Sequence, residues 1–95
     1  MTIYPIGYID PREIAKAART DAVSRITVTT TAGHTFDGDE ISQTRMARAI
    51  IALQATGTPN VNWVLADNSV IQATPNELAE ALALSGAAQA AIWVI

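Results

Sequence analysis

The chain of 95 residues is the length of one domain, with 49% hydrophobic and 16% charged residues. A net charge of −3 argues against a general nucleic-acid-binding protein, because such a protein needs a basic face to release counterions. The lack of cysteine excludes disulfides and thiolate zinc sites, residues 1–7 lack the pattern of a signal peptide, and no apolar run is long enough to predict a membrane span.

The first predicted element is a helix near the N-terminus. Asp10 can cap this helix, Pro11 suits its first position, and Glu13 favours its positive end, so we expect a helix that ends at about Val23. The helix carries few apolar side chains, so it packs weakly or packs on a partner. The apolar segment of residues 3–9 is interpreted as an extended arm. We therefore separate residues 1–24, the arm and helix, from a domain over residues 25–95.

A β-hairpin followed by a helix is predicted next. Residues 26–30 are β-branched throughout, and residues 35–37 can return as the second strand after a break at Ala32 and Gly33. Asp39 is the expected N-cap of a helix over residues 40–55, and Gly57 is its expected stop. Four residues spaced for one face of this helix form the expected core stripe: Met46, Ala49, Ile50 and Leu53.

A second unit of the same kind follows. Residues 61–65 and 70–73 are predicted to pair across a turn rich in Asp and Asn. A capping box from Thr74 to Glu77 then begins a helix that should end near Trp93.

The order of these elements predicts an α+β fold. It has an N-terminal arm and helix, then two β-hairpin–helix (ββα) units, with one small antiparallel sheet packed on the helices. The two cap residues, Asp39 and Thr74, are 35 positions apart. Because side-chain identity between the units is poor, we interpret the repeat as a shared architecture and not as proof of duplication.

The sequence offers few candidates for a catalytic or metal-binding site. His34 is the only histidine, no serine stands in an activating motif, and we interpret His34 as an exposed turn residue. Residues 37–40 are acidic and could attract a cation, but capping of a helix by Asp39 explains them better. We therefore expect no enzyme, no catalytic residue, no cofactor and no metal.

Several surfaces are candidates for protein–protein contact. Arg12, Lys16 and Arg19 form a basic stripe on the first helix, which is either solvated or docked on an acidic partner surface. Small residues recur every four positions in the last helix (Ala79 onwards), where they either pack on the domain's own sheet or contact another subunit. The apolar chain end is either buried or docked on a partner. The candidate interface residues are Ile3, Tyr4, Ile6, Tyr8, Ile9, Arg12, Lys16, Arg19, Ala83, Ala87, Ala91, Trp93, Val94 and Ile95.

Two sequence runs carry a family resemblance. Residues 39–50 begin with Asp-Glu-Ile-Ser-Gln-Thr-Arg-Met, and residues 63–69 read Trp-Val-Leu-Ala-Asp-Asn-Ser. With the alanine-rich stretch from Leu78 to Trp93, they resemble an uncharacterised domain of bacteriophage tail, tail-fibre and tail-assembly proteins. The resemblance covers residues 25–95. That family has no established catalytic residues, so none is implied here.

The resemblance implies a function in phage assembly. We expect a non-enzymatic structural component of a tail tip, baseplate or tail fibre, which contacts phage tail or fibre proteins and forms a homo-oligomer. Two alternatives are a tail-fibre assembly chaperone and a small phage-encoded inhibitor of a host protein. The expected location is the virion tail, or the host cytoplasm during assembly, with no nucleic-acid partner.

Overall fold

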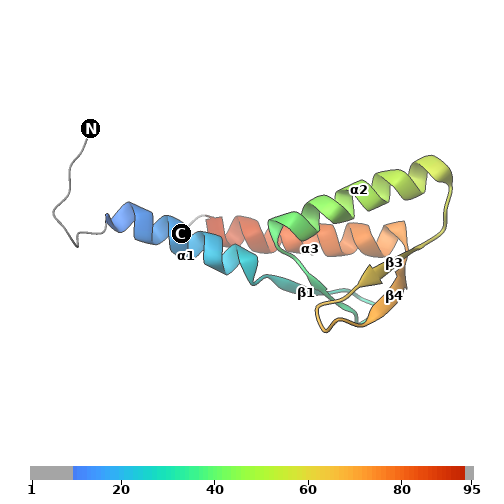
Figure 1. Ribbon diagram of the computed structural model, residues 1–95, viewed down its shortest axis with the longest axis horizontal. Coiled ribbons are helices and arrows are strands. Elements are labelled where there is room, and N and C mark those ends of the chain that lie inside the picture. The colour runs from blue at the N-terminus through green and yellow to red at the C-terminus, as the bar shows by residue number, and fades with distance from the viewer. Residues whose placement is uncertain (1–9, 94–95) are drawn as a thin grey trace.

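The computed structural model describes residues 10–93. Within this range the chain forms three helices and four short strands (Figure 1), which confirms the predicted α+β fold and the order of its elements. None of the helices in the described range is long and apolar enough to cross a bilayer. The elements are α1 (Pro11–Ser24), β1 (Thr27–Thr29), β2 (Thr35–Asp37), α2 (Glu40–Thr56), β3 (Val61–Val64), β4 (Val70–Ala73) and α3 (Pro75–Trp93).

The strands form two separate antiparallel hairpins, β1–β2 and β3–β4, each a two-stranded sheet. The expectation of one continuous sheet is therefore wrong. The hairpins do meet, through a hydrogen bond of 3.0 Å from the backbone N–H of Ala66 to the carbonyl oxygen of Thr35. Ala66 lies beyond the end of β3, so this bond joins the two hairpins without extending either strand ladder.

The core lies between α2, α3 and the inner faces of the hairpins. Phe36, Met46 and Leu78 are fully buried there, with Leu53 and Leu65 buried beside them. Phe36 comes from β2, Met46 and Leu53 from α2, and Leu78 from α3. Leu65 directly follows β3, at the start of the turn of the second hairpin. We call the part formed by α2, α3 and the hairpins the body of the protein.

Local hydrogen bonds fix where α1 and α2 begin and end. Asp10 caps α1 by accepting from the backbone N–H of Arg12 at 2.9 Å. Asp39 caps α2 by accepting from the backbone N–H and the hydroxyl of Ser42. Gly57 ends α2 in the left-handed conformation, with φ of 70°. These three predictions from the sequence are confirmed.

The turn between β3 and β4 is held by its own polar side chains. Asn68 has a left-handed φ of 68°, which Asn tolerates better than most residues. The Asp67 carboxylate accepts from the Ser69 hydroxyl and the Ser69 backbone N–H, and these bonds hold the pKa of Asp67 below its usual value. The predicted turn chemistry is confirmed.

Only half of the predicted capping box forms at the start of α3. Thr74 accepts from the backbone N–H of Glu77 at 3.1 Å, as predicted. The Glu77 carboxylate, however, bonds to the Thr30 hydroxyl and to Nδ1 of His34, each at 2.8 Å. A partly buried contact with the first hairpin thus replaces the exposed local bond back to the cap.

Thr74→Ala is expected to lower the free energy of unfolding by about 1 kcal/mol, because the Glu77 N–H loses its acceptor. Urea denaturation followed by circular dichroism measures the change. Thr58→Ala, in the exposed loop after α2, is the matched control and should change stability by less than about 0.5 kcal/mol. Equal losses in the two variants would show that Thr74 does not act as a cap.

Candidate protein-binding surface

α1 projects away from the body, and its last turns approach the end of α3 (Figure 1). Val23 is the only buried residue of the 14 in this helix, and Ile14 keeps 53% of its surface exposed. An isolated helix of this length is marginal in water, so most of its stability must come from packing. Contacts at one end of the helix leave most of α1 available to a partner.

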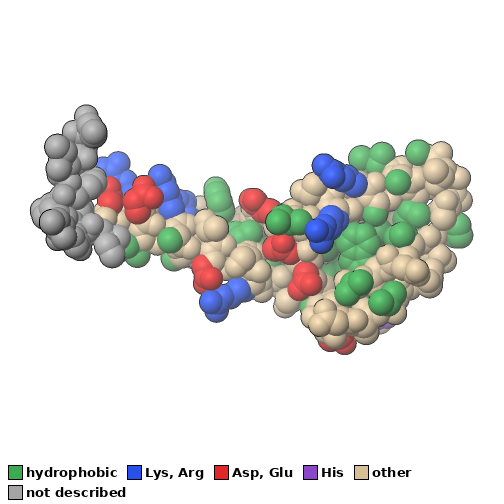
Figure 2. Space-filling view, in the orientation of Figure 1, with side chains coloured by type: hydrophobic (Ala, Val, Ile, Leu, Met, Phe, Trp, Pro, Cys, Tyr) green, Lys and Arg blue, Asp and Glu red, His purple; other side chains and the backbone are tan. Residues whose placement is uncertain are grey.

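The basic stripe lies on the face of α1 that turns toward the body. Arg19, Lys16 and Arg12 precede Val23 by four, seven and eleven positions, so they share its side of the helix. Lys16 pairs with Glu13 at 3.6 Å on the exposed surface, and Arg12 forms no ion pair with any residue from 10 to 93. Figure 2 shows Lys and Arg side chains along the projecting helix.

Arg19 connects α1 to the end of α3. Its guanidinium carbon lies 5.3 Å from the centroid of the Trp93 ring, which is a cation–π distance. The Nε atom of Arg19 is buried and has no hydrogen-bond partner in the described part of the chain. Trp93 remains 50% exposed, so its side chain is neither part of the core nor fully exposed.

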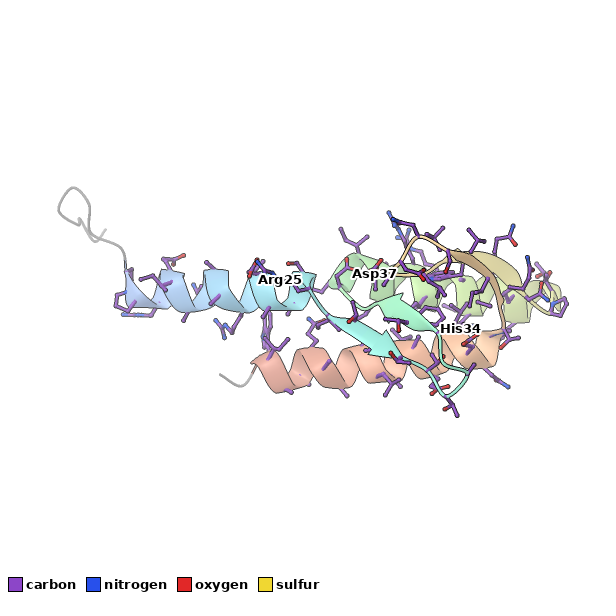
Figure 3. The ribbon with its side chains drawn as sticks, turned by 90° about the horizontal axis from the view of Figure 1, so that it is seen from below. Arg25, His34 and Asp37 are labelled. Atoms are coloured by element: carbon purple, nitrogen blue, oxygen red, sulfur yellow. The ribbon has the colours of Figure 1, made fainter. Side chains whose placement is uncertain are left out.

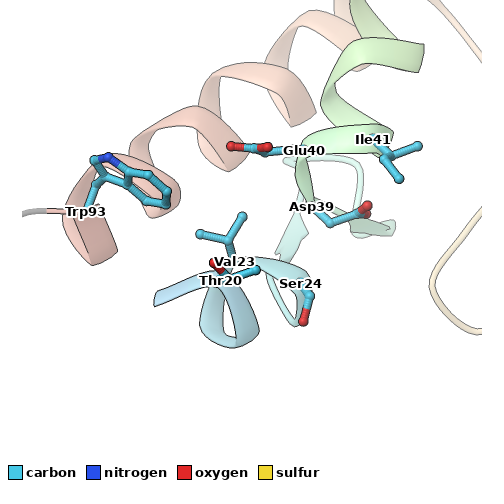
Figure 4. Close-up of a pocket in the computed structure, with 7 residues that line it drawn as sticks. All are labelled: Thr20, Val23, Ser24, Asp39, Glu40, Ile41 and Trp93. Atoms are coloured by element: carbon cyan, nitrogen blue, oxygen red, sulfur yellow. The ribbon is translucent and has the colours of Figure 1, made fainter. Parts of the chain in front are cut away.

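A hollow opens where the three helices converge, and we call it the three-helix notch (Figure 4). Its volume is about 220 Å³. Figure 4 shows Val23 pointing into it and the Glu40 carboxylate directed across it toward Trp93. Glu40 also accepts from the Gln89 amide at 2.6 Å. The lining residues are Thr20, Val23, Ser24, Asp39, Glu40, Ile41 and Trp93.

The alanine row of α3 faces outward. Its four members, Ala79, Ala83, Ala87 and Ala91, are all exposed. The helix packs on the body through the opposite side, where Leu78, Ala81 and Ser85 are buried. Packing of the row on the domain's own sheet is therefore wrong, and a contact between subunits stays a prediction.

Some of the predicted interface residues lie outside the described part of the chain. These are Ile3, Tyr4, Ile6, Tyr8, Ile9, Val94 and Ile95.

Sequence reasoning missed a polar network around His34, a residue of the first hairpin that Figure 3 labels. His34 is half-buried rather than exposed, because Glu77 holds its Nδ1 atom and also accepts from the buried Thr30 hydroxyl. Glu80 accepts from the backbone N–H and the hydroxyl of Thr31, both at 2.7 Å. These bonds fasten the tip of the first hairpin to α3. A span of 43 residues separates His34 from Glu77, so no local pattern could have indicated the pair.

The acidic run of residues 37–40 has mainly a structural role. Asp39 caps α2, as described above, and Glu40 lies in its first turn near the positive end of the helix dipole. Between residues 10 and 93, no three His, Asp or Glu side chains are grouped so that they could hold a metal ion.

Comparison with known proteins gives one match. A family model described as a domain of unknown function, DUF4376, matches residues 10–93. The matched range includes α1, which lies before the domain predicted over residues 25–95. No curated protein and no solved structure matches the chain.

Proposed function

We propose, from the premise that this chain belongs to the DUF4376 family, that it is a non-enzymatic structural component of a phage tail. It would act through protein–protein contacts in a tail tip, baseplate or tail fibre. The protein-binding part of the proposal rests on α1, because a projecting helix with one buried residue lacks packing that a partner can supply. The phage part rests on the resemblance of residues 39–50 and 63–69.

The partners of the acidic side chains support a structural role. Glu77 and Glu80 hold the first hairpin against α3, and Asp39 caps α2. The single histidine is held by one of these carboxylates. Groups that could serve as general acids or bases are thus bonded to neighbours that build the fold, which favours binding over catalysis as the role of the domain.

Mass spectrometry of purified virions tests the structural role, and we expect the protein to be present in mature particles. Ile14→Glu should lower its incorporation, because a charge replaces the largest exposed apolar side chain of α1. Ile51→Glu is the matched control, since Ile51 is 66% exposed on α2, and it should be incorporated normally.

Other results would overturn this proposal. Presence in infected cells but absence from mature particles would indicate a tail-fibre assembly chaperone. Co-purification with a host enzyme and with no tail protein would indicate an inhibitor.

A further inference from the structure

We propose that the three-helix notch of one copy binds the basic stripe of α1 from a second copy. This inference deepens the proposed function by naming a partner for α1. The contact can nevertheless be tested in solution, so it can fail or succeed independently of any role in a virion.

The chemistry of the notch suits a long cationic side chain. Val23, Ile41 and Trp93 provide apolar walls, and the Glu40 carboxylate reaches across the opening. Arginine and lysine pack their methylene stems on apolar surface while their charged ends seek a carboxylate. The Trp93 ring already holds the guanidinium of Arg19, which shows that its surroundings accept a cation.

The basic stripe offers such side chains outside the notch. Arg12 and Lys16 are exposed, and they lie one helical turn apart on the same face of α1. Arg12 has no ion pair among the described residues, and the Lys16–Glu13 pair is exposed and weak. Both cations can therefore bind a partner's carboxylate without breaking a strong ion pair within residues 10–93 of their own chain.

The notch of a copy cannot be filled by its own Arg12. Arg12 lies eleven residues before Val23, and a helix rises 1.5 Å per residue, so the two positions are about 16 Å apart along the axis. An arginine side chain does not extend that far. If Arg12 fills a notch, that notch belongs to another molecule.

The two surfaces lie on parts of the chain with opposite net charge, which favours self-association. Residues 10–25 carry four basic and three acidic side chains, whereas residues 26–95 carry two basic and six acidic ones. The helix segment is thus slightly positive and the rest of the chain strongly negative. Complementary fields of this kind steer two molecules together and weaken as salt rises.

The solution mass measured by light scattering tests the contact. We expect the wild-type chain to exceed the mass of a monomer and to dissociate as salt increases. Arg12→Glu with Lys16→Glu should weaken association by at least about tenfold, because like charges then meet at the notch. The double variant Arg45→Glu with Arg48→Glu makes the same charge change on α2 and should associate as the wild type does.

Two variants test the acceptor side. Glu40→Lys reverses the charge of the carboxylate and removes the bond from the Gln89 amide. Ile41→Lys places a cation at an exposed position on the notch wall and breaks no side-chain hydrogen bond. Both should weaken association by a similar factor. Ile41→Lys should leave the circular dichroism and the melting temperature close to those of the wild type, whereas Glu40→Lys loses the Gln89 bond and should keep its circular dichroism but melt at a lower temperature.

Mixing a variant of the basic stripe with a variant of the three-helix notch tests whether these two surfaces bind each other. The variant with reversed α1 charges keeps an intact notch, and the Glu40→Lys variant keeps an intact α1. Mixing them should give a larger mass than either variant alone. A wild-type chain that is monomeric at all concentrations, unchanged association in both notch variants, or a mixture with no gain in mass would each overturn the proposal.

Discussion

Phe36→Ala is expected to lower the free energy of unfolding by about 3–5 kcal/mol. Phe36 is fully buried at the centre of β2, where it belongs to the same cluster as Met46 and Leu78. A domain of this length has a total stability near the low end of about 5–15 kcal/mol, so the loss should leave much of the protein unfolded at 25 °C. Circular dichroism with chemical denaturation measures both the folded fraction and the free energy.

Val64→Ala is the matched control for the core substitution. Val64 lies on β3 and is 56% exposed, so the change removes apolar atoms from a strand without opening a cavity. It should cost less than about 1 kcal/mol. If the two alanine variants unfolded at the same denaturant concentration, Phe36 would not be part of the core.

The helices could be predicted from the sequence because their signals are local. Asp10 and Asp39 bond to groups two and three residues away, and Gly57 ends α2 through its own backbone angle. The predicted ends of α1 and α2 each differ by one residue from the observed ends. The turn at Asn68 is another case in which neighbouring residues decide the conformation.

Contacts between distant segments could not be predicted in this way. Glu77 matches the local pattern of a capping box, yet its carboxylate bonds to Thr30 and His34 on the first hairpin. The arrangement of the four short strands as two separate sheets is also a feature that no local pattern indicated, and β1 of the first hairpin contacts α3. A sequence pattern shows which residues share a face but not what that face meets.

The last helix shows this limit clearly. Its sequence is apolar on several sides, so both the stripe from Leu78 and the stripe from Ala79 could have been buried. The larger side chain of Leu78 fills the core, and the alanine row faces outward. Packing volume decides between two stripes that have similar periodicity.

The candidate site combines predicted and unpredicted residues. Arg19 and Trp93 were both expected at interfaces, but nothing in the sequence indicated that they touch each other. The notch joins part of the last turns of α1, residues 39–41 and Trp93, which come together only because α1 and the end of α3 meet beside the start of α2. The basic stripe of α1 could be predicted from the sequence, but its proposed acceptor, Glu40, could be named only from the fold.

Gly38→Ala is expected to destabilise the protein by about 1–3 kcal/mol through overpacking. A Cβ atom at Gly38 would lie 2.6 Å from Cγ2 of Ile26 and 2.6 Å from Oγ of Ser85. Both neighbours are buried, and Ser85 is held by its hydrogen bond to the Ala81 carbonyl, so neither side chain can move aside freely. Differential scanning calorimetry should show a melting temperature lower by several degrees.

Gly86→Ala is the control that gives the opposite sign. A Cβ atom at Gly86 would meet nothing within 4 Å, and the residue lies inside α3, where alanine is the better helix former. This change should therefore stabilise the protein by about 0.5–1 kcal/mol. The same chemical substitution then moves stability in two directions, depending only on what surrounds the added methyl group. If both variants shifted the melting temperature the same way, the close approach of α3 to the loop between β2 and α2 would be wrong.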